Sequence, residues 1–267
     1  MKNIYVFVCI IIFLFVSCSP DSETDEVPAN ELVLSIESPG NSFEVDQPVS
    51  FVVKSNQNLS EVAISNNNWQ SSHGQLDGDG TGLGFAKTVF MSFDQIGMHT
   101  INVKIESLEG KKKETSFQVD IIKGTAIKIN RITINSFKNM GQSWDPEYAA
   151  DDVNRLADLV FGLRKNYIIT SFDEREYASK TWYISEVLMN EGNLTWDLSA
   201  ANLHIDPNLI LWFGLGDDDG GGIAQDLLLG PPFDLDVMLK NHIIEKPATI
   251  TLQKQDIDLE VVFEIEW

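Results

Sequence analysis

The sequence predicts an all-β protein with two consecutive antiparallel β-sandwich domains. Apolar and polar residues alternate with the period of a β-strand in segments such as 98–106 and 257–266. Turn-forming residues recur roughly every 8 to 12 residues, a spacing typical of sandwich domains. The 267 residues are 43% hydrophobic, which is enough for one large or two medium-sized cores. We expect at most one short helix, near 150–156 or 234–241.

The first sandwich is expected to span residues 32–123. Within 98–106, Ile101, Val103 and Ile105 point to one face of the strand, and the polar residues between them point to the other. Polar turns separate this strand from its neighbours. The expected strands lie at 32–36, 49–54, 62–64, 84–93, 98–106 and 117–121.

The last strands of this segment also carry a family resemblance. They read Gly97-Met98-His99-Thr100-Ile101-Asn102-Val103-Lys104-Ile105, followed by a turn at Gly110. This pattern resembles the end of bacterial Ig-like domains of the PKD type. The resemblance implies the fold of residues 32–123 but no ligand.

A long polar loop at 66–80 interrupts the first sandwich and carries Trp69. One interpretation is that Trp69 stacks on a sugar whose hydroxyls bond the neighbouring Asn and Asp side chains. The other is that Trp69 covers the edge of the core beneath a polar loop, and we favour this one.

The second sandwich is expected to span residues 125–267. Its clearest strand is the C-terminal segment, where Leu259, Val261 and Phe263 alternate with acidic and other outward-facing residues. One face of this strand should therefore be buried and the other solvated. The other expected strands lie at 127–134, 159–163, 167–170, 181–184 and 249–252.

An acidic, glycine-rich loop runs from Gly216 to Asp226, directly after the apolar stretch 209–213. Its four carboxylates repel one another unless water solvates them or a cation neutralises them. Calcium prefers such hard oxygen ligands. The loop is therefore either a calcium site or a solvated acidic turn, and the sequence leaves both open.

A second resemblance includes this loop. Ser143-Trp144-Asp145, then Ala157-Asp158, then Leu211 to Asp219 and Asp226 to Gly230 follow the order seen in C2-like domains. In those domains two loops at one end of an eight-stranded sandwich supply aspartates to calcium. The resemblance thus implies a C2-like second sandwich and Ca²⁺ as cofactor. The implied metal ligands are Asp145, Asp158, Asp217, Asp219 and Asp226.

The chain begins with features of an exported lipoprotein. Lys2 precedes an apolar run from Ile4 to Val16, which is too short to span a bilayer but suits a signal peptide. The run ends in Phe15-Val16-Ser17-Cys18, which resembles a bacterial lipoprotein box. We therefore expect a signal peptide at 1–17 and lipidation at Cys18. No cysteine pair remains after cleavage, so we expect no disulfide.

Residues 18–31 are polar, acidic and proline-bearing, as expected of a flexible tether. An acidic run directly after the lipidated cysteine resembles the export signal of surface-displayed lipoproteins in some Gram-negative bacteria. We therefore expect a lipid-anchored protein of the bacterial outer membrane that faces the exterior. The alternative is a spacer that faces the periplasm.

Charge and missing motifs narrow the function. A net charge of −21 argues against nucleic-acid binding, which requires basic surface. The four histidines show no zinc-site spacing, and no nucleophile elbow or phosphate-binding loop is present, so we expect no enzyme. The preferred hypothesis is a calcium-stabilised envelope binding or adhesion protein with an unknown protein or glycan partner. The alternatives are a glycan-binding lipoprotein accessory to an uptake system and a purely structural lipoprotein.

Overall fold

The structure is a computed structural model. The architecture given below is that of one compact unit, Leu32–Trp267. The predicted signal peptide 1–17, Cys18 and the tether up to residue 29 lie outside the described residues. Within the described part, no helix is long and apolar enough to cross a membrane. The described residues are 30–66, 70–74, 82–218, 223–226 and 235–267.

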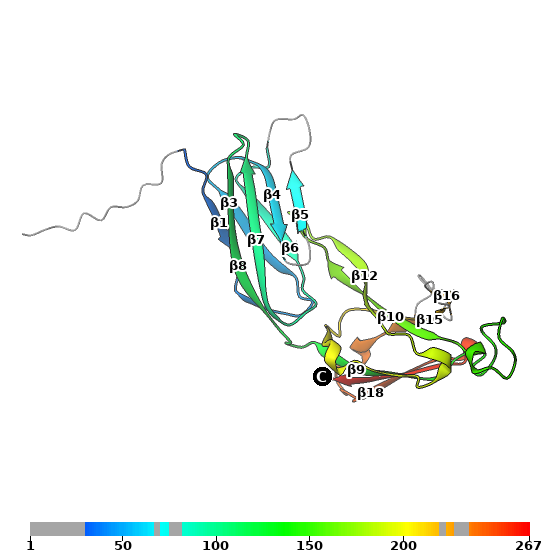
Figure 1. Cartoon of the computed structure of the whole chain (residues 1–267). Coiled ribbons are helices and arrows are strands. Elements are labelled where there is room, and N and C mark those ends of the chain that lie inside the picture. The colour runs from blue at the N-terminus through cyan, green and yellow to red at the C-terminus, as the bar shows by residue number, and fades with distance from the viewer. Residues whose placement is uncertain (1–29, 67–69, 75–81, 219–222, 227–234) are drawn as a thin grey trace, which may run out of the picture. The chain divides into compact units, whose positions relative to one another are not determined.

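The first half of the compact unit contains strands that share one apolar core. They are β1 Leu34–Glu37, β2 Ser42–Glu44, β3 Val49–Ser55, β4 Leu59–Ser65, β5 Gln70–Gly74, β6 Ala86–Met91, β7 Gly97–Ser107 and β8 Lys112–Ile122. One sheet has the order β1-β3-β6 and the other has the order β2-β8-β7-β4-β5 (Figure 1). All pairings are antiparallel except that of β2 with β8, which is parallel.

The strand period places the core of this sandwich. Ile101, Val103 and Ile105 of β7 are buried, and the residues between them are exposed or half-buried, as the alternation predicted. They pack in one cluster with apolar residues of the facing sheet, such as Phe51 and Val89. Fully burying a side chain of this size contributes about 1.5–3 kcal/mol.

The second half forms another pair of sheets. The strands are β9 Ile127–Ser136, β10 Leu159–Ile168, β11 Ser171–Phe172, β12 Tyr177–Ile184, β13 Thr195–Asp197, β14 Leu203–Ile205, β15 Leu211–Asp218, β16 Ile223–Asp226, β17 Leu235–Val237, β18 Thr249–Lys254 and β19 Leu259–Glu266. One sheet has the order β12-β10-β15-β16, with β17 also paired to β15. The other has the order β13-β9-β19-β18, with β14 also paired to β9.

A second apolar cluster lies between these sheets. Val261 and Phe263 of β19 are fully buried, whereas their neighbours Val262 and Glu264 are half-buried. Phe161 of β10 packs edge-on against Trp196 at a centroid distance of 5.0 Å. The predicted all-β class is therefore confirmed, and both halves have the character of a β-sandwich.

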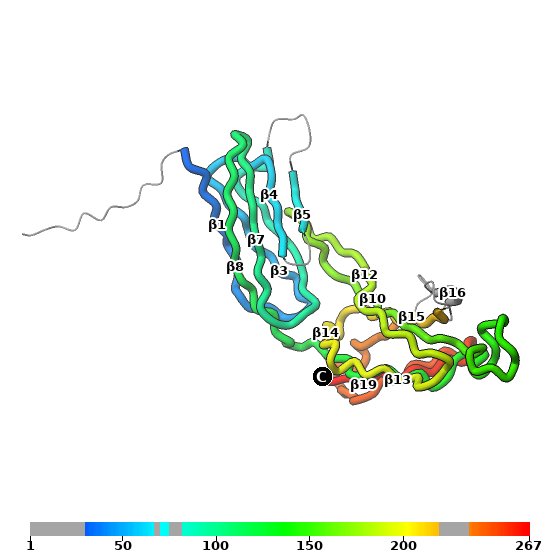
Figure 2. Tube along the Cα trace, viewed as in Figure 1, coloured from blue at the N-terminus to red at the C-terminus, as the bar shows by residue number. Residues whose placement is uncertain are grey.

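The hairpin arm, residues 159–184, connects the two halves. The sequence suggested separate strands at 159–163 and 167–170, but β10 runs unbroken from Leu159 to Ile168 and pairs with β12. Between them, β11 joins the first sandwich by pairing antiparallel with Val89 and Phe90 of β6. The sheet order there is therefore β1-β3-β6-β11. Figure 2 traces the arm from the second sandwich to the region of β5 and β6.

Helical structure in the described residues consists of 3₁₀ turns. Two of them fall in the regions where the sequence suggested one short helix, and each has only three or four residues. Their bounds are η1 Val153–Arg155, η2 Met189–Glu191, η3 Ser199–Ala201, η4 Leu239–His242 and η5 Gln255–Ile257.

Candidate ligand-binding cleft

Two of the predicted calcium ligands lie next to each other at one end of the second sandwich. Asp217, near the end of β15, is fully buried, and its Oδ1 accepts a hydrogen bond of 2.6 Å from the N–H of Asp158. Asp158 in turn accepts a 2.7 Å hydrogen bond from the N–H of Asn190. The Asp218 N–H donates to the Asp158 carbonyl over 2.8 Å. These bonds connect the end of β15, the residue before β10 and the turn η2 at this end of the sandwich.

The other predicted ligands are Asp145, Asp219 and Asp226. Asp145 is buried in the loop before η1, and its N–H donates to the Arg155 carbonyl. Asp219 and the side chain of Asp226 lie outside the described residues, although β16 places the backbone of Asp226 opposite Gly216. Among the residues described, no three His, Cys, Asp or Glu side chains are grouped to hold a metal ion. The calcium site therefore stays a prediction.

A buried lysine marks a different site, where the hairpin arm meets the first sandwich. On β10, Phe161, Leu163 and Lys165 share the inward face because they lie two residues apart. Lys165 is fully buried, and its Nζ donates hydrogen bonds of 2.7 and 2.9 Å to the Asp46 carboxylate. The same Nζ lies 4.1 Å from the ring centroid of Trp182 on β12.

Asp46 is well suited to receive this charge. It lies in the turn between β2 and β3 with φ of 63°, a conformation that Asp and Asn tolerate better than other side chains. Its N–H donates to the Phe93 carbonyl over 2.8 Å, and its Oδ2 accepts from the Asp206 N–H at 3.2 Å. The backbone of Asp46 is thus bonded to the first sandwich, and its carboxylate is bonded to the second.

The ionisation of this pair depends on both partners. Burial lowers the pKa of the Lys165 ammonium, and the charge of Asp46 offsets only part of this effect. Burial also raises the pKa of the Asp46 carboxyl, against the charge and hydrogen bond of Lys165. Each charge is therefore costly without the other in this environment.

A second ion pair involves the other strand of the arm. Lys180 of β12 is opposite Lys165 in the β10–β12 register, and its Nζ lies 2.6 Å from Oδ2 of Asp94. The ammonium also lies 4.9 Å from the Tyr167 ring centroid. Burial alone would raise the pKa of Asp94, but the hydrogen bond and charge of Lys180, with the charge of Lys165, lower it below its ordinary value.

The tip of the arm is docked by polar contacts. Asp173 accepts from the Thr88 N–H at 3.1 Å and pairs with Lys87 at 2.5 Å. Its own N–H donates to the Thr88 carbonyl at 2.7 Å. Phe172 stacks on His73 with a centroid distance of 5.2 Å. Contacts with β6 and with β5 thus reinforce the pairing of β11.

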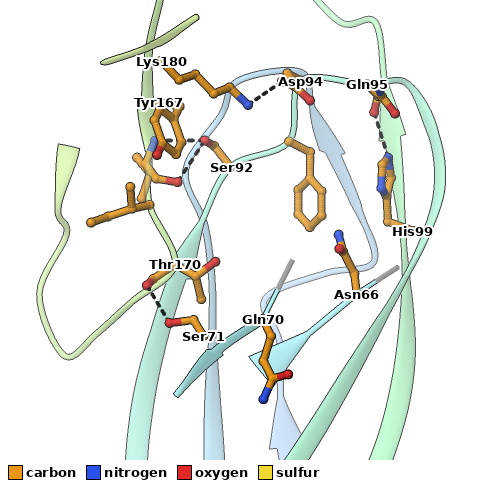
Figure 3. A pocket seen from close by; sticks show the side chains of 13 residues that line it. Asn66, Gln70, Ser71, Ser92, Asp94, Gln95, His99, Tyr167, Thr170 and Lys180 are labelled. Atoms are coloured by element: carbon orange, nitrogen blue, oxygen red, sulfur yellow. Dashed lines mark hydrogen bonds and ion pairs between the residues drawn. The ribbon is translucent and has the colours of Figure 1, made fainter. Parts of the chain in front are cut away.

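Between these contacts lies an open cleft of about 510 Å³. The first sandwich and the arm both line it, and Figure 3 shows its polar side chains. They are Asn66, Gln70, Ser71, Ser92, Asp94, Gln95, His99, Tyr167, Thr170 and Lys180.

Hydrogen bonds brace the walls of the cleft. Ser92 Oγ accepts from the Ile168 N–H at 3.0 Å, and Ser71 Oγ donates to the Thr170 carbonyl at 3.2 Å. His99 Nε2 lies 2.8 Å from the Gln95 carbonyl oxygen (Figure 3). The opening is therefore held by contacts in the protein itself, as a preformed binding site requires.

Of the predicted metal ligands whose side chains the structure describes, Asp145, Asp158 and Asp217, none lines this cleft. The sequence nevertheless contained one indication of the contact between the hairpin arm and the first sandwich, which lies beside the cleft. Lys165 occupies an inward position of a strand whose preceding inward residues are apolar, and a buried lysine needs an acidic partner. The sequence did not indicate that this partner is Asp46, which is 119 residues away.

Comparisons with models of known protein families and with curated proteins find no match to this chain. The fold and the site geometry are therefore the basis for the functional proposal.

Proposed function

We propose that this chain is a lipid-anchored binding protein of the bacterial cell envelope, and that the cleft beside the hairpin arm is its ligand site. In this proposal Cys18 carries the lipid and residues 18–31 form the tether. An Ig/PKD-like sandwich is followed by a C2-like sandwich at the surface of the outer membrane. A periplasm-facing orientation is the alternative.

The observation that carries the proposal is the preformed polar cleft. Its volume of about 510 Å³ falls within the range of small-ligand sites, about 300–1,000 Å³. The ion pairs Lys165–Asp46 and Lys180–Asp94 join the two sides beside it. A site built on strands and fixed in advance avoids the entropy cost of ordering its walls when the ligand binds.

The test is a survey with small probes. The full-length lipoprotein, isotopically labelled in micelles, is titrated separately with a neutral disaccharide, a uronate disaccharide and a dipeptide. We expect one class to shift the amide resonances of the cleft, such as those of Ser71, Ile168 and Thr170. If no probe shifts them at millimolar concentration, the cleft is not a ligand site for these classes and the proposal is wrong.

The membrane part of the proposal has its own test. Radiolabelled palmitate should be incorporated into the wild-type chain and not into Cys18→Ala. Protease added to intact cells should degrade the wild-type protein if it faces the exterior. Degradation only after the outer membrane is opened would support the periplasmic orientation instead.

Calcium stabilisation is a second candidate function, favoured by the contact between Asp158 and Asp217. The hydrogen bond between these two residues brings the last residues of β15 next to the end of the 143–158 loop. In the sequence, Asp219 follows β15 directly and Asp226 lies seven residues later. A cation at this end would bind only the folded protein and would therefore stabilise it.

The calcium test compares thermal unfolding in EDTA and in millimolar Ca²⁺. At 100 times its dissociation constant, a bound ion adds about 2.7 kcal/mol to the free energy of unfolding. The double variant Asp219→Asn/Asp226→Asn should lose this increase. Asp217→Asn is a poor choice because Asp217 also accepts the Asp158 N–H. An unchanged Tm would leave the loop as a solvated acidic turn.

A further inference from the structure

We propose that the cleft binds an uncharged, polyhydroxylated ligand, namely a sugar unit of a neutral glycan. The inference rests on the proposed role of the cleft as a ligand site and specifies the chemistry of that ligand. It follows from the charges, the hydrogen-bonding groups and the apolar surface of the lining residues.

The charges of the cleft are already paired. Among the lining residues described, Asp94 is the carboxylate and Lys180 is the ammonium, and they contact each other at 2.6 Å. Their side chains are 27% and 36% exposed, so both are partly withdrawn from water. An ionic ligand would have to compete with this pair, whereas a neutral ligand would not. The charge arrangement therefore favours a neutral ligand.

The hydrogen-bonding groups that remain available can both donate and accept. Within the described residues, the side-chain amides of Gln70 and Gln95 and the hydroxyl of Tyr167 make no hydrogen bond to the protein. An amide side chain has both a donor and an acceptor, and so does a phenol hydroxyl. A sugar hydroxyl has the same dual character. These groups therefore match a row of hydroxyls better than a single charged group.

The cleft also offers apolar contact. Ile169 lines it together with the polar groups. Figure 3 shows the ring of Tyr167 among them. Tyrosine presents an apolar body with a polar tip, which allows it to contact the C–H face of a sugar while its hydroxyl bonds the ring substituents. The position of Tyr167 follows from the strand period, because it lies two residues beyond Lys165 on the same face of β10.

Binding of neutral disaccharides to the full-length lipoprotein tests this inference. The probes are maltose, cellobiose and N,N'-diacetylchitobiose, and the comparators are a uronate disaccharide and a dipeptide. The detergent must have no sugar headgroup, because such a headgroup would compete for the cleft. Calorimetric titration should give saturable binding for at least one neutral disaccharide and a weaker response for the comparators.

Two variants identify the site. Tyr167→Phe removes one hydroxyl and keeps the ring, and Gln70→Ala removes an amide that has no protein partner among the described residues. Each should weaken binding of the neutral sugar about threefold to tenfold, the range expected for one lost hydrogen bond. The matched control is Asn102→Ala, an exposed polar residue of β7 outside the cleft, which should leave the affinity unchanged.

The outcomes separate this inference from the proposed function. If the dipeptide or the uronate binds with the same sensitivity to Tyr167→Phe while neutral sugars do not, the sugar inference is wrong and the cleft is still a ligand site. If no probe binds, or if neither Tyr167→Phe nor Gln70→Ala changes the affinity, the inference and the proposed function are both overturned.

Discussion

At the scale of single residues, Lys165 is the least expected feature of the molecule. A lysine without solvent contact lies on a strand whose other inward residues are apolar. Its charge is accommodated by the Asp46 carboxylate, the His204 carbonyl at 3.4 Å and the ring of Trp182. An apolar residue of similar length would fill the same space without needing these partners. The pair therefore contributes more to selecting which segments pack together than to the free energy of folding.

Removing one partner of this pair should be far more damaging than removing both. Lys165→Met leaves the Asp46 carboxylate buried without its cation and should lower the free energy of unfolding by about 3–5 kcal/mol at neutral pH. Adding Asp46→Asn, which suits the positive φ at this position, should recover much of the loss. Guanidinium denaturation of the two single variants and the double variant measures the coupling between them.

The control for this cycle is the exposed pair Lys54–Glu37, whose N–O distance is 2.6 Å. Lys54→Met should change the free energy of unfolding by about 0–1 kcal/mol, as is usual for surface ion pairs. Equal losses for Lys54→Met and Lys165→Met would show that burial does not set the energy of the Lys165–Asp46 pair.

At the scale of elements, the hairpin arm is docked on the first sandwich by carboxylates whose pKa values are lowered. Burial acts to raise the pKa of Asp94 and of Asp173, but in each case hydrogen bonds and a neighbouring lysine lower it overall. A carboxyl with a lowered folded-state pKa contributes stability above its unfolded-state pKa. That contribution is lost as the pH falls through the lower folded-state value.

Arm docking should therefore weaken in acid, starting near pH 4 and continuing below it. The stability difference between the wild type and Lys180→Met, which removes the partner of Asp94, should be largest at neutral pH. It should shrink as the pH falls from about 4 through the lower pKa of folded Asp94, because the carboxyl is protonated first in the unfolded state and then in the folded state. Urea denaturation at a series of pH values measures this difference. A gap that stays constant down to pH 2 would contradict the role assigned to Asp94.

The elements also show how far the sequence is informative. Strands β7 and β19 were predicted because their apolar residues alternate without interruption and one face of each is buried. Strand β10 was divided in two because Arg164, Lys165 and Asn166 interrupt its apolar pattern. Only a partner distant in the sequence explains why a lysine can continue the buried face. Local periodicity therefore predicts strands, but it does not predict the contacts that join distant segments.

The same limit applies to the candidate site. The contact between Asp158 and Asp217 joins two residues that the C2-like resemblance implied as calcium ligands, and the calcium site itself stays a prediction. The cleft could not be predicted, because residues of four strands and the loops between them converge on it and none of them forms a recognisable motif. Gln70, Gln95 and Tyr167 are ordinary polar residues in the sequence, and only the fold brings them together.

At the scale of the whole molecule, two apolar clusters lie within one compact unit, Leu32–Trp267. The contacts between them include the β11–β6 pairing and the Lys165–Asp46 pair. Two cores joined in this way should unfold together, because neither can open without breaking the contacts of the other.

Calorimetry of the full-length protein should therefore show a single cooperative transition for this unit. The triple variant Lys165→Met/Asp46→Asn/Asp173→Asn removes the buried pair and weakens the arm tip, and it should give two resolved transitions. Lys54→Met should keep one transition. Two transitions in the wild type would mean that the cores are energetically independent.

The pairing of β11 with β6 also has a consequence for biogenesis. Strand β6 ends at Met91, but the segment that covers its edge begins at Ser171. If the chain emerges from the translocation machinery N-terminus first, the backbone donors and acceptors along this edge stay uncovered while the residues between them are delivered. Open strand edges are templates for association between chains. The chain should therefore be most prone to association through this edge before Ser171 and Phe172 are available to cover it.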